Sequence, residues 1–263
     1  MNVPISKISS IYKFRDLLVS WTYRTIRARY QQSILGGLWA IIVPISQTLI
    51  FSIIFTYFIP VKTGGIPYVV FSYIALVPWN FFSTSIIDMV DSLVSNIHLV
   101  SKIFFPREIL TISYLLARFL DFLIASCLLL ILMVYYQIPS NILGWLFVPL
   151  ILLIQIALSL GLGLAGAALN VFYRDIRHLF VLILQIWFYA TPIIYPVSAV
   201  PPQFRIFYSL NPMAGVIESY RAIFLYQKLP DISLLLSAGI SLLVLSFGYW
   251  FFKRVEFQFA DVV

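Results

Sequence analysis

Six long apolar stretches with very few charged residues constrain this 263-residue chain more than any single motif does. A membrane-crossing helix needs about 20 consecutive apolar residues, because the hydrocarbon core is about 30 Å thick. The stretches have this length, and they lack the period-two alternation of barrel strands. We therefore predict an all-α polytopic membrane protein with six transmembrane helices. The predicted spans are residues 38–59, 68–87, 109–136, 146–172, 179–197 and 233–252.

Charged residues support this prediction and give an orientation. They make up 10% of the chain, whereas a soluble domain has about 25%. Lys and Arg concentrate in the cytoplasmic loops of membrane proteins. Most of the 17 Lys and Arg residues fall on one side of the predicted spans, together with both termini. We therefore expect a cell (inner) membrane protein with cytoplasmic termini, whose net charge of +7 serves topology and anionic lipid rather than nucleic acid.

The chain is predicted to form a single domain over residues 1–263. Residues 1–37 would be a cytoplasmic N-terminal segment, residues 38–252 the six spans, and residues 253–263 a cytoplasmic tail. The one cysteine lies in an apolar run, and neither histidine has a partner at metal-ligand spacing, so we expect no disulfide and no metal site.

Residues 12–30 predict an amphipathic helix that lies in the membrane interface. Apolar residues recur at i, i+3, i+4 and i+7 from Phe14 to Trp21, and charged residues fall largely on the other face. Two interpretations stay open: an anchor on the lipid surface, or a cuff around the mouth of a translocation path. The candidate residues of this gate or interface helix are Phe14, Trp21, Arg24, Arg27, Arg29 and Tyr30.

The predicted cytoplasmic link 88–108 mixes charged and apolar residues. Apolar residues between positions 94 and 101 suggest a short amphipathic helix, and Pro106 marks the start of the next one. This link is either a solvated loop or a docking helix that fits a groove on a cytoplasmic motor protein.

A pair of charges lies inside the third predicted span. Arg118 and Asp121 are three residues apart, so they share a helix face and can pair. Charges at this depth are costly unless they are paired or face water or protein. The pair either fixes helix packing or takes part in a proton or substrate relay.

Aromatic residues make up 17% of the chain. They either form the core and the interfacial belt, or line a wide path in which ring faces and hydroxyls could pass a glycan without tight binding. The candidate channel-lining residues are Trp39, Tyr57, Phe58, Trp79, Phe82, Trp187 and Tyr189. The external link 198–231 is punctuated by proline, and it predicts one or two short helices in or dipping into the outer leaflet.

Four segments resemble landmarks of bacterial polysaccharide ABC exporter permeases. Their order and spacing agree with that family over nearly the whole chain, without separating O-antigen, capsule and teichoic-acid exporters. The segments are RYQQSILGGLW at 29–39 followed by Pro44, NVFYRDIRH at 170–178, TPIIYP at 191–196, and LNPM at 210–213.

The resemblance implies a transport subunit that is not itself an enzyme. It implies a homodimer with two copies of a cytoplasmic P-loop ATPase, which would hold the ATP and Mg, and this chain has no P-loop motif or cofactor of its own. Lipid-linked polysaccharide would leave through a channel at the dimer interface, and residues 12–30 would gate its cytoplasmic mouth. The ATPase-coupling residues would be Asp91, Asn96, His98 and Lys102, with Arg174, Asp175 and Arg177 as a second contact.

Two alternatives stay open, and a third is disfavoured. The chain could be an ABC permease for a smaller lipid or drug. It could also be a stand-alone secondary transporter or flippase that uses Arg118 and Asp121. A membrane glycosyltransferase is disfavoured, because no loop contains a cluster of acidic residues.

Overall fold

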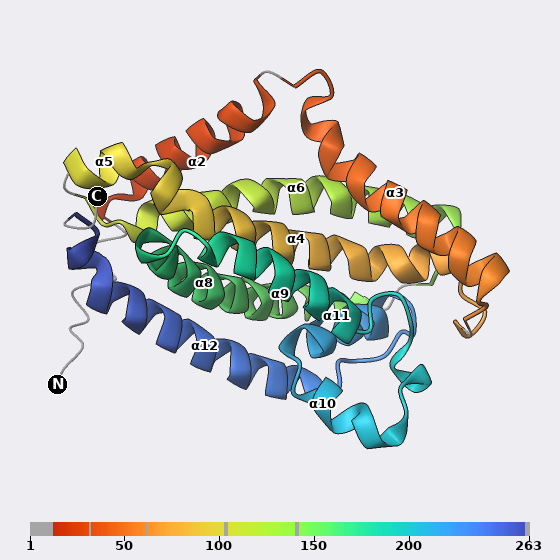
Figure 1. The fold of residues 1–263 in the computed structure, drawn as a ribbon. Helices are drawn as coiled ribbons and strands as arrows, with labels where there is room; N and C mark the ends of the chain where they lie inside the picture. Colours follow the sequence, from red (N-terminus) through yellow and green to blue (C-terminus); the bar gives the residue numbers. More distant parts are fainter. Residues whose placement is uncertain (1–12, 32, 62, 103–104, 140–141, 261–263) are drawn as a thin grey trace.

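The computed structural model describes residues 13–31, 33–61, 63–102, 105–139 and 142–260, and all the regular secondary structure in these ranges is helical (Figure 1). The all-α prediction is confirmed. The longer helices are α2 (Arg15–Tyr30), α3 (Trp39–Ile53), α4 (Tyr68–Ser95), α6 (Glu108–Tyr135), α8 (Val148–Phe172), α9 (Ile176–Ala190), α11 (Pro212–Phe224) and α12 (Ser233–Val255). The short ones are η2 (Gly36–Leu38), η3 (Ile54–Phe58), α5 (Ile97–Lys102), α7 (Ile142–Trp145), η4 (Val197–Ala199), η5 (Pro202–Phe204), α10 (Arg205–Ser209) and η6 (Glu256–Ala260).

Five helical segments in the described part of the chain are long and apolar enough to cross a membrane, where the sequence predicted six. They are Gly36–Phe58, Tyr68–Ser95, Glu108–Tyr135, Leu143–Phe172 and Ser233–Phe259.

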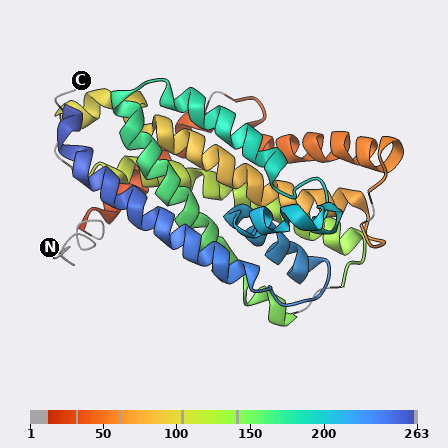
Figure 2. The same cartoon turned by 60° about the horizontal axis from the view of Figure 1, so that its bottom comes forward.

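The fifth predicted span, 179–197, is realised as the shorter helix α9. This helix has 15 residues, which is about 22 Å at a rise of 1.5 Å per residue. A proline disfavours helical backbone in the residue before it. Thr191, which precedes Pro192, is extended with φ −107° and ψ 141°, and α9 therefore stops short. It starts at the end of the bundle that carries α5 and stops partway along α4 (Figures 1 and 2). Helix α2 begins and helix α12 ends at the end that carries α5 (Figure 1).

Helix α4 lies at the centre of the bundle, in contact with α3, α6, α8, α9 and α11 (Figure 2). Its Phe71, Tyr73 and Phe82 are fully buried. Helices α8 and α12 lie side by side in both views (Figures 1 and 2). They approach so closely that a Cβ atom added to Gly248 would lie 2.0 Å from the carbonyl oxygen of Gly161. Glycine at both positions permits this backbone-to-backbone contact.

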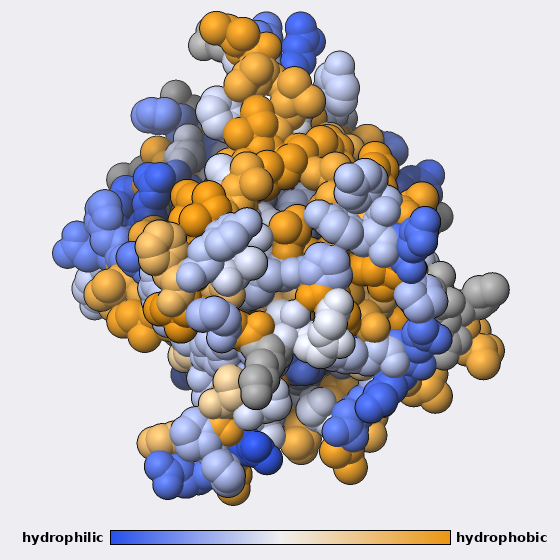
Figure 3. Space-filling model, turned by 90° about the vertical axis from the view of Figure 1, so that its right-hand side faces the viewer, coloured by the Kyte–Doolittle hydropathy of each residue, from blue (hydrophilic) through white to orange (hydrophobic). Residues whose placement is uncertain are grey.

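At the opposite end of the bundle, α11 is inserted between α4, α8 and α12. Almost all of its residues are buried, whereas α10 is largely exposed. Asn211 caps α11 by accepting a hydrogen bond from the Met213 amide at 3.1 Å, and Pro212 occupies the first helical position. The link 198–231 thus contains short helices, as predicted, and one of them, α11, packs inside the bundle. Polar and apolar residues are mixed over the surface of this end (Figure 3).

Candidate gate and coupling site

Helix α2 lies against the bundle without burying any of its residues. Phe14, Leu17 and Trp21 are half-buried, whereas Arg24 and Arg27 are exposed, as the apolar spacing predicted. Leu17 and Trp21 pack against the apolar cluster that contains Leu93 and Phe252. This contact holds the first half of α2, and a polar contact holds its end.

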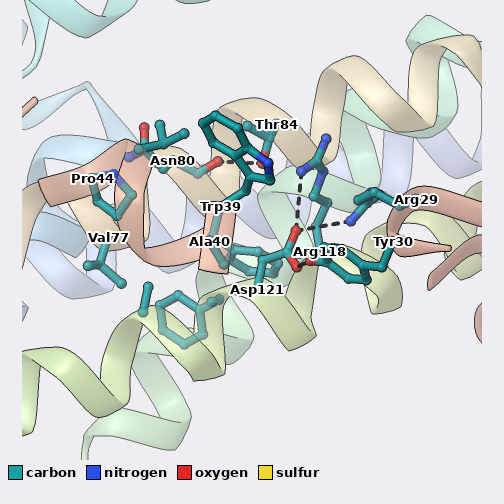
Figure 4. A pocket seen from close by; sticks show the side chains of 14 residues that line it. Arg29, Tyr30, Trp39, Ala40, Pro44, Val77, Asn80, Thr84, Arg118 and Asp121 are labelled. Atoms are coloured by element: carbon teal, nitrogen blue, oxygen red, sulfur yellow. Dashed lines mark hydrogen bonds and ion pairs between the residues drawn. The ribbon is translucent and has the colours of Figure 1, made fainter. Parts of the chain in front are cut away.

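The end of α2 is joined to α4 and α6 by ion pairs. Arg29 donates from Nη2 to Asp88 Oδ2 at 2.8 Å and from Nη1 to Asp121 Oδ2 at 3.0 Å. Arg118 donates from Nε to Asp88 Oδ2 at 2.7 Å and from Nη1 to Asp121 Oδ2 at 3.2 Å. The Tyr30 hydroxyl donates to Asp121 Oδ1. Figure 4 shows Arg29, Tyr30 and Arg118 converging on Asp121.

This network is electrically neutral, because two guanidinium groups face two carboxylates. The four side chains are 15–25% exposed, and charges this deep are tolerated when they are paired and hydrogen-bonded. Burial, followed by the hydrogen bond to Asp121, raises the pKa of Tyr30 to about 12. The Tyr30 hydroxyl therefore keeps its proton at neutral pH and remains a donor.

The predicted Arg118–Asp121 pair is present at 3.2 Å, but its further partners Arg29 and Asp88 were not predicted. The second span was predicted to end at residue 87, which placed Asp88 and Asp91 in the link 88–108, outside the spanning helix. The structure corrects this, because α4 continues to Ser95. Apolar residues at 86, 89, 90 and 93 carry the helical spacing past residue 87, and this signal could have extended the predicted helix.

A cavity of about 400 Å³ lies beneath the corner between α2 and α3. Its polar end is formed by Arg29, Tyr30, Arg118 and Asp121, and its other end is largely apolar (Figure 4). The apolar lining comes from Trp39, Ala40, Val43, Pro44, Val77, Phe81, Phe122 and Ala125.

The candidate channel-lining aromatics separate into two groups. Trp39, Tyr57, Phe58 and Tyr189 are exposed, so a path along the outside of this chain could touch them. The half-buried Trp187 donates from Nε1 to Asn211 Oδ1 at 2.9 Å, which ties α9 to the start of α11.

Trp79 and Phe82 belong to the core instead. Trp79 is 4% exposed and Phe82 is 0% exposed. Their rings lie 5.7 Å from Phe188 and 5.4 Å from Trp187, respectively. A buried side chain lines no open path in this conformation, so the structure removes both from the channel-lining set.

The two predicted ATPase contacts lie side by side. Arg177 Nη1 lies 3.5 Å from Asp91 Oδ1, which joins the first turn of α9 to the last turns of α4. Asn170 adds to this junction by donating to the Val90 carbonyl at 3.0 Å. Asp91, Arg174, Asp175 and Arg177 thus form one composite patch, and a coupling surface would combine residues from both segments.

The remaining candidates of this surface differ in their surroundings. Asn96 donates to the Ser92 carbonyl at 2.8 Å and to the Tyr114 hydroxyl at 3.1 Å, which is a structural use of the side chain. His98, Arg174 and Asp175 are exposed. Lys102 ends α5, and its side chain lies outside the described residues.

A fully buried arginine at the far end of the bundle was also missed. The Arg221 guanidinium donates to the carbonyls of Pro192 and Ile193, each at 2.6 Å, and to Glu218 at 2.9 Å. It also lies 3.8 Å from the ring centre of Phe71. Burial lowers the pKa of Arg221 and Glu218 opposes this, and an arginine stays charged in proteins. Arg221 thereby fixes α11 to the segment that follows α9.

No group of three or more His, Cys, Asp or Glu residues that could hold a metal ion occurs among the described residues. The site consists of a surface helix, a neutral ion-pair network, an adjacent cavity and a composite patch at one end of the bundle. Through these contacts α2 is joined to α4 and α6, and α4 is joined to α9.

The fold and the site define a multi-pass helical membrane protein with a surface helix held at one end of the bundle. Residues 17–225 match the ABC-2 type transporter family, to which this chain belongs. It is 32% identical to the O-antigen export system permease protein RfbA of Myxococcus xanthus, over 98% of this chain and 100% of that protein. A second RfbA, from Klebsiella pneumoniae, is 32% identical over 94% of this chain and 95% of the relative. The polysialic acid transport protein KpsM of Escherichia coli is 27% identical over 75% of this chain and 77% of KpsM.

Proposed function

We propose that this chain is the channel-forming subunit of an ATP-driven exporter that moves lipid-linked polysaccharide of the O-antigen type across the cell (inner) membrane. The observation that carries the proposal is the nearly end-to-end similarity to O-antigen export permeases. The chain acts as a homodimer with two copies of a P-loop ATPase. ATP and Mg bind to the ATPase, and this chain contributes a single transmembrane domain, residues 1–263, with both termini in the cytoplasm.

The placement of α2 and of the composite patch supports this division of labour. Helix α2 begins, α4 ends and α8 meets α9 at the same end of the bundle (Figure 1). Exposed polar residues there, such as Arg174 and Asp175, are available to a soluble partner. A movement of the ATPase at this end would reach α4 directly, because Arg177 pairs with Asp91.

The exposed aromatic side chains support a glycan as the cargo. Four of the candidate residues are exposed: Trp39 at the start of α3, Tyr57 and Phe58 in η3, and Tyr189 near the end of α9. Aromatic faces attract the C–H faces of sugars without a strong directional bond. A second copy of this chain that faced these segments would enclose a path through which successive sugar units could slide.

The alternative of a stand-alone, proton-coupled transporter loses support. Arg118 and Asp121 are already paired with each other, and both also belong to the network that includes Arg29 and Asp88. These charges connect helices, which is a structural use and requires no relay.

The test is to purify the tagged chain from its native membrane in mild detergent, identify its partners by mass spectrometry, and reconstitute the complex in vesicles. We expect a stoichiometric P-loop ATPase and ATP-dependent accumulation of labelled lipid-linked polysaccharide. A folded dimer that reproducibly lacks an ATPase would contradict the proposal. Transport of small lipids with no competition from the polysaccharide would favour the smaller-substrate permease.

A further inference from the structure

We propose that Arg29 is the positioning residue of α2, and that Asp88, Arg118 and Asp121 form an acidic seat that holds this helix in the closed position. The inference rests on the proposed role of α2 as the gate of an exporter. The seat belongs entirely to α4 and α6. Arg29 approaches it from α2 and reaches both carboxylates.

The three residues of the seat are also joined to one another by contacts that do not involve α2. Arg118 bridges its two aspartates, with hydrogen bonds of 2.7 and 3.2 Å to Asp88 and one of 3.2 Å to Asp121. Two carboxylates and one guanidinium leave the seat with a net charge of −1. Arg29 neutralises that charge, so its withdrawal would leave a poorly solvated carboxylate without a full partner. Electrostatics therefore favours the docked position of α2.

The side chains that hold this end of α2 by polar contacts are Arg29 and Tyr30, and Arg29 supplies both of the ion pairs. The apolar contact of Leu17 and Trp21 lies near the beginning of the helix. Arg29 and Tyr30 lie in its last turn, beside the corner that leads to α3. Gly36 occupies this corner with φ of 50°, a left-handed conformation that glycine adopts at little cost. Loss of the Arg29 contacts would let the end of α2 move about its apolar contact.

Such a movement would open the cavity beneath the α2–α3 corner, because Arg29 and Tyr30 form part of its wall. The seat also lies close to the composite patch. Asp88 precedes Asp91 by three residues on α4, and Asp91 pairs with Arg177. A shift of the last turns of α4 by the ATPase would therefore move one of the two carboxylates that hold Arg29.

The position of α2 can be measured with a thiol placed on the cavity wall. In a Cys127→Ser background, Thr84→Cys places a single thiol on the wall of the cavity that Arg29 also lines. The rate at which this thiol reacts with a membrane-impermeant reagent reports how often the cavity opens. We expect Arg29→Gln to raise the reaction rate about tenfold, as for a coupling of roughly 1.4 kcal/mol. The reconstituted complex should also leak a small polar dye without ATP. Arg29→Lys should fall between wild type and Arg29→Gln, because lysine keeps the charge and loses the two-pronged geometry.

Lys13→Gln is the matched control, since it removes one positive charge from an exposed position just before α2. It should react and leak as the wild type does. Arg29→Gln combined with Asp121→Asn separates positioning from charge compensation, because the seat then keeps a neutral Asp88–Arg118 pair. We expect the thermal stability to recover in this double variant while the fast thiol reaction and the leak persist.

Two results would overturn the inference: an Arg29→Gln variant that reacts and leaks as the wild type does, or a double variant that regains both the slow reaction and the tight vesicles. Export by the wild-type complex is measured in the same vesicles. Failure of that export alone would refute the proposed function and leave the thiol data to decide on the seat.

Discussion

Substitution of Arg221 tests how the far end of the bundle is held together. In Arg221→Gln the carbonyls of Pro192 and Ile193 lose charged donors at 2.6 Å, and Glu218 loses its ion-pair partner at 2.9 Å. Arg221 is fully buried, so water does not replace these bonds. A buried acceptor left without its partner costs about 1–3 kcal/mol, and two carbonyls lose theirs, whereas Glu218 is 31% exposed and can be solvated; together this is about 2–5 kcal/mol. The unfolding free energy of the purified subunit should fall by about this amount.

The assay is thermal unfolding of the detergent-solubilised protein, followed by fluorescence-detected gel filtration. One kcal/mol shifts the Tm of a domain of 150–250 residues by about 2–4 °C, so we expect a decrease of about 10 °C. Arg221→Lys should lose less, because the ammonium keeps the charge near Glu218. Arg205→Gln is the control, since the exposed Arg205 donates only a 3.3 Å hydrogen bond to the Val200 carbonyl. An Arg221→Gln protein as stable as this control would refute the assignment of Arg221 as the tie between α11 and the end of α9.

Three further predictions concern the other end of the bundle and its packing. Reversal of both Arg24 and Arg27 to Glu should impair export in a vesicle assay while dimer assembly, followed by gel filtration, is unchanged, because both side chains are exposed on α2. Val94→Pro should break the last turn of α4 and uncouple ATP hydrolysis from export, whereas Ile97→Pro, at the first position of α5, should be tolerated. Gly248→Ala should lower the unfolding free energy by about 1–3 kcal/mol or more, because its Cβ would meet the Gly161 carbonyl. Gly239→Ala is the control and should leave the unfolding free energy unchanged, because a Cβ there has no atom within 4 Å.

The features of the fold that depend on short stretches of sequence were predicted well. Helices span the predicted apolar runs, and the half-buried face of α2 has the predicted spacing. Two helix ends differ from the prediction, those of α4 and α9, and in both the nearby sequence contains the reason. Pro192 stops α9, and apolar residues carry α4 past residue 87.

The candidate site was predicted less completely, because its bonds join distant parts of the chain. The sequence contains the Arg118–Asp121 spacing, but nothing in it indicates that Arg29, 92 residues before Asp121, would complete the network. Burial also separated residues that look alike in the sequence. Trp79 and Trp39 are both tryptophans in predicted spans, yet only Trp39 is exposed.

The sequence by itself determined the class of protein, the approximate spans and the amphipathic character of the first helix. These follow from hydropathy and periodicity, which are properties of neighbouring residues and of the thickness of a bilayer. Only the tertiary structure decided which charges meet at Asp88 and Asp121, and which carbonyls Arg221 holds. Those contacts depend on the rotation of each helix about its axis and on its packing against helices far away in the chain, and many rotations satisfy the same hydropathy pattern.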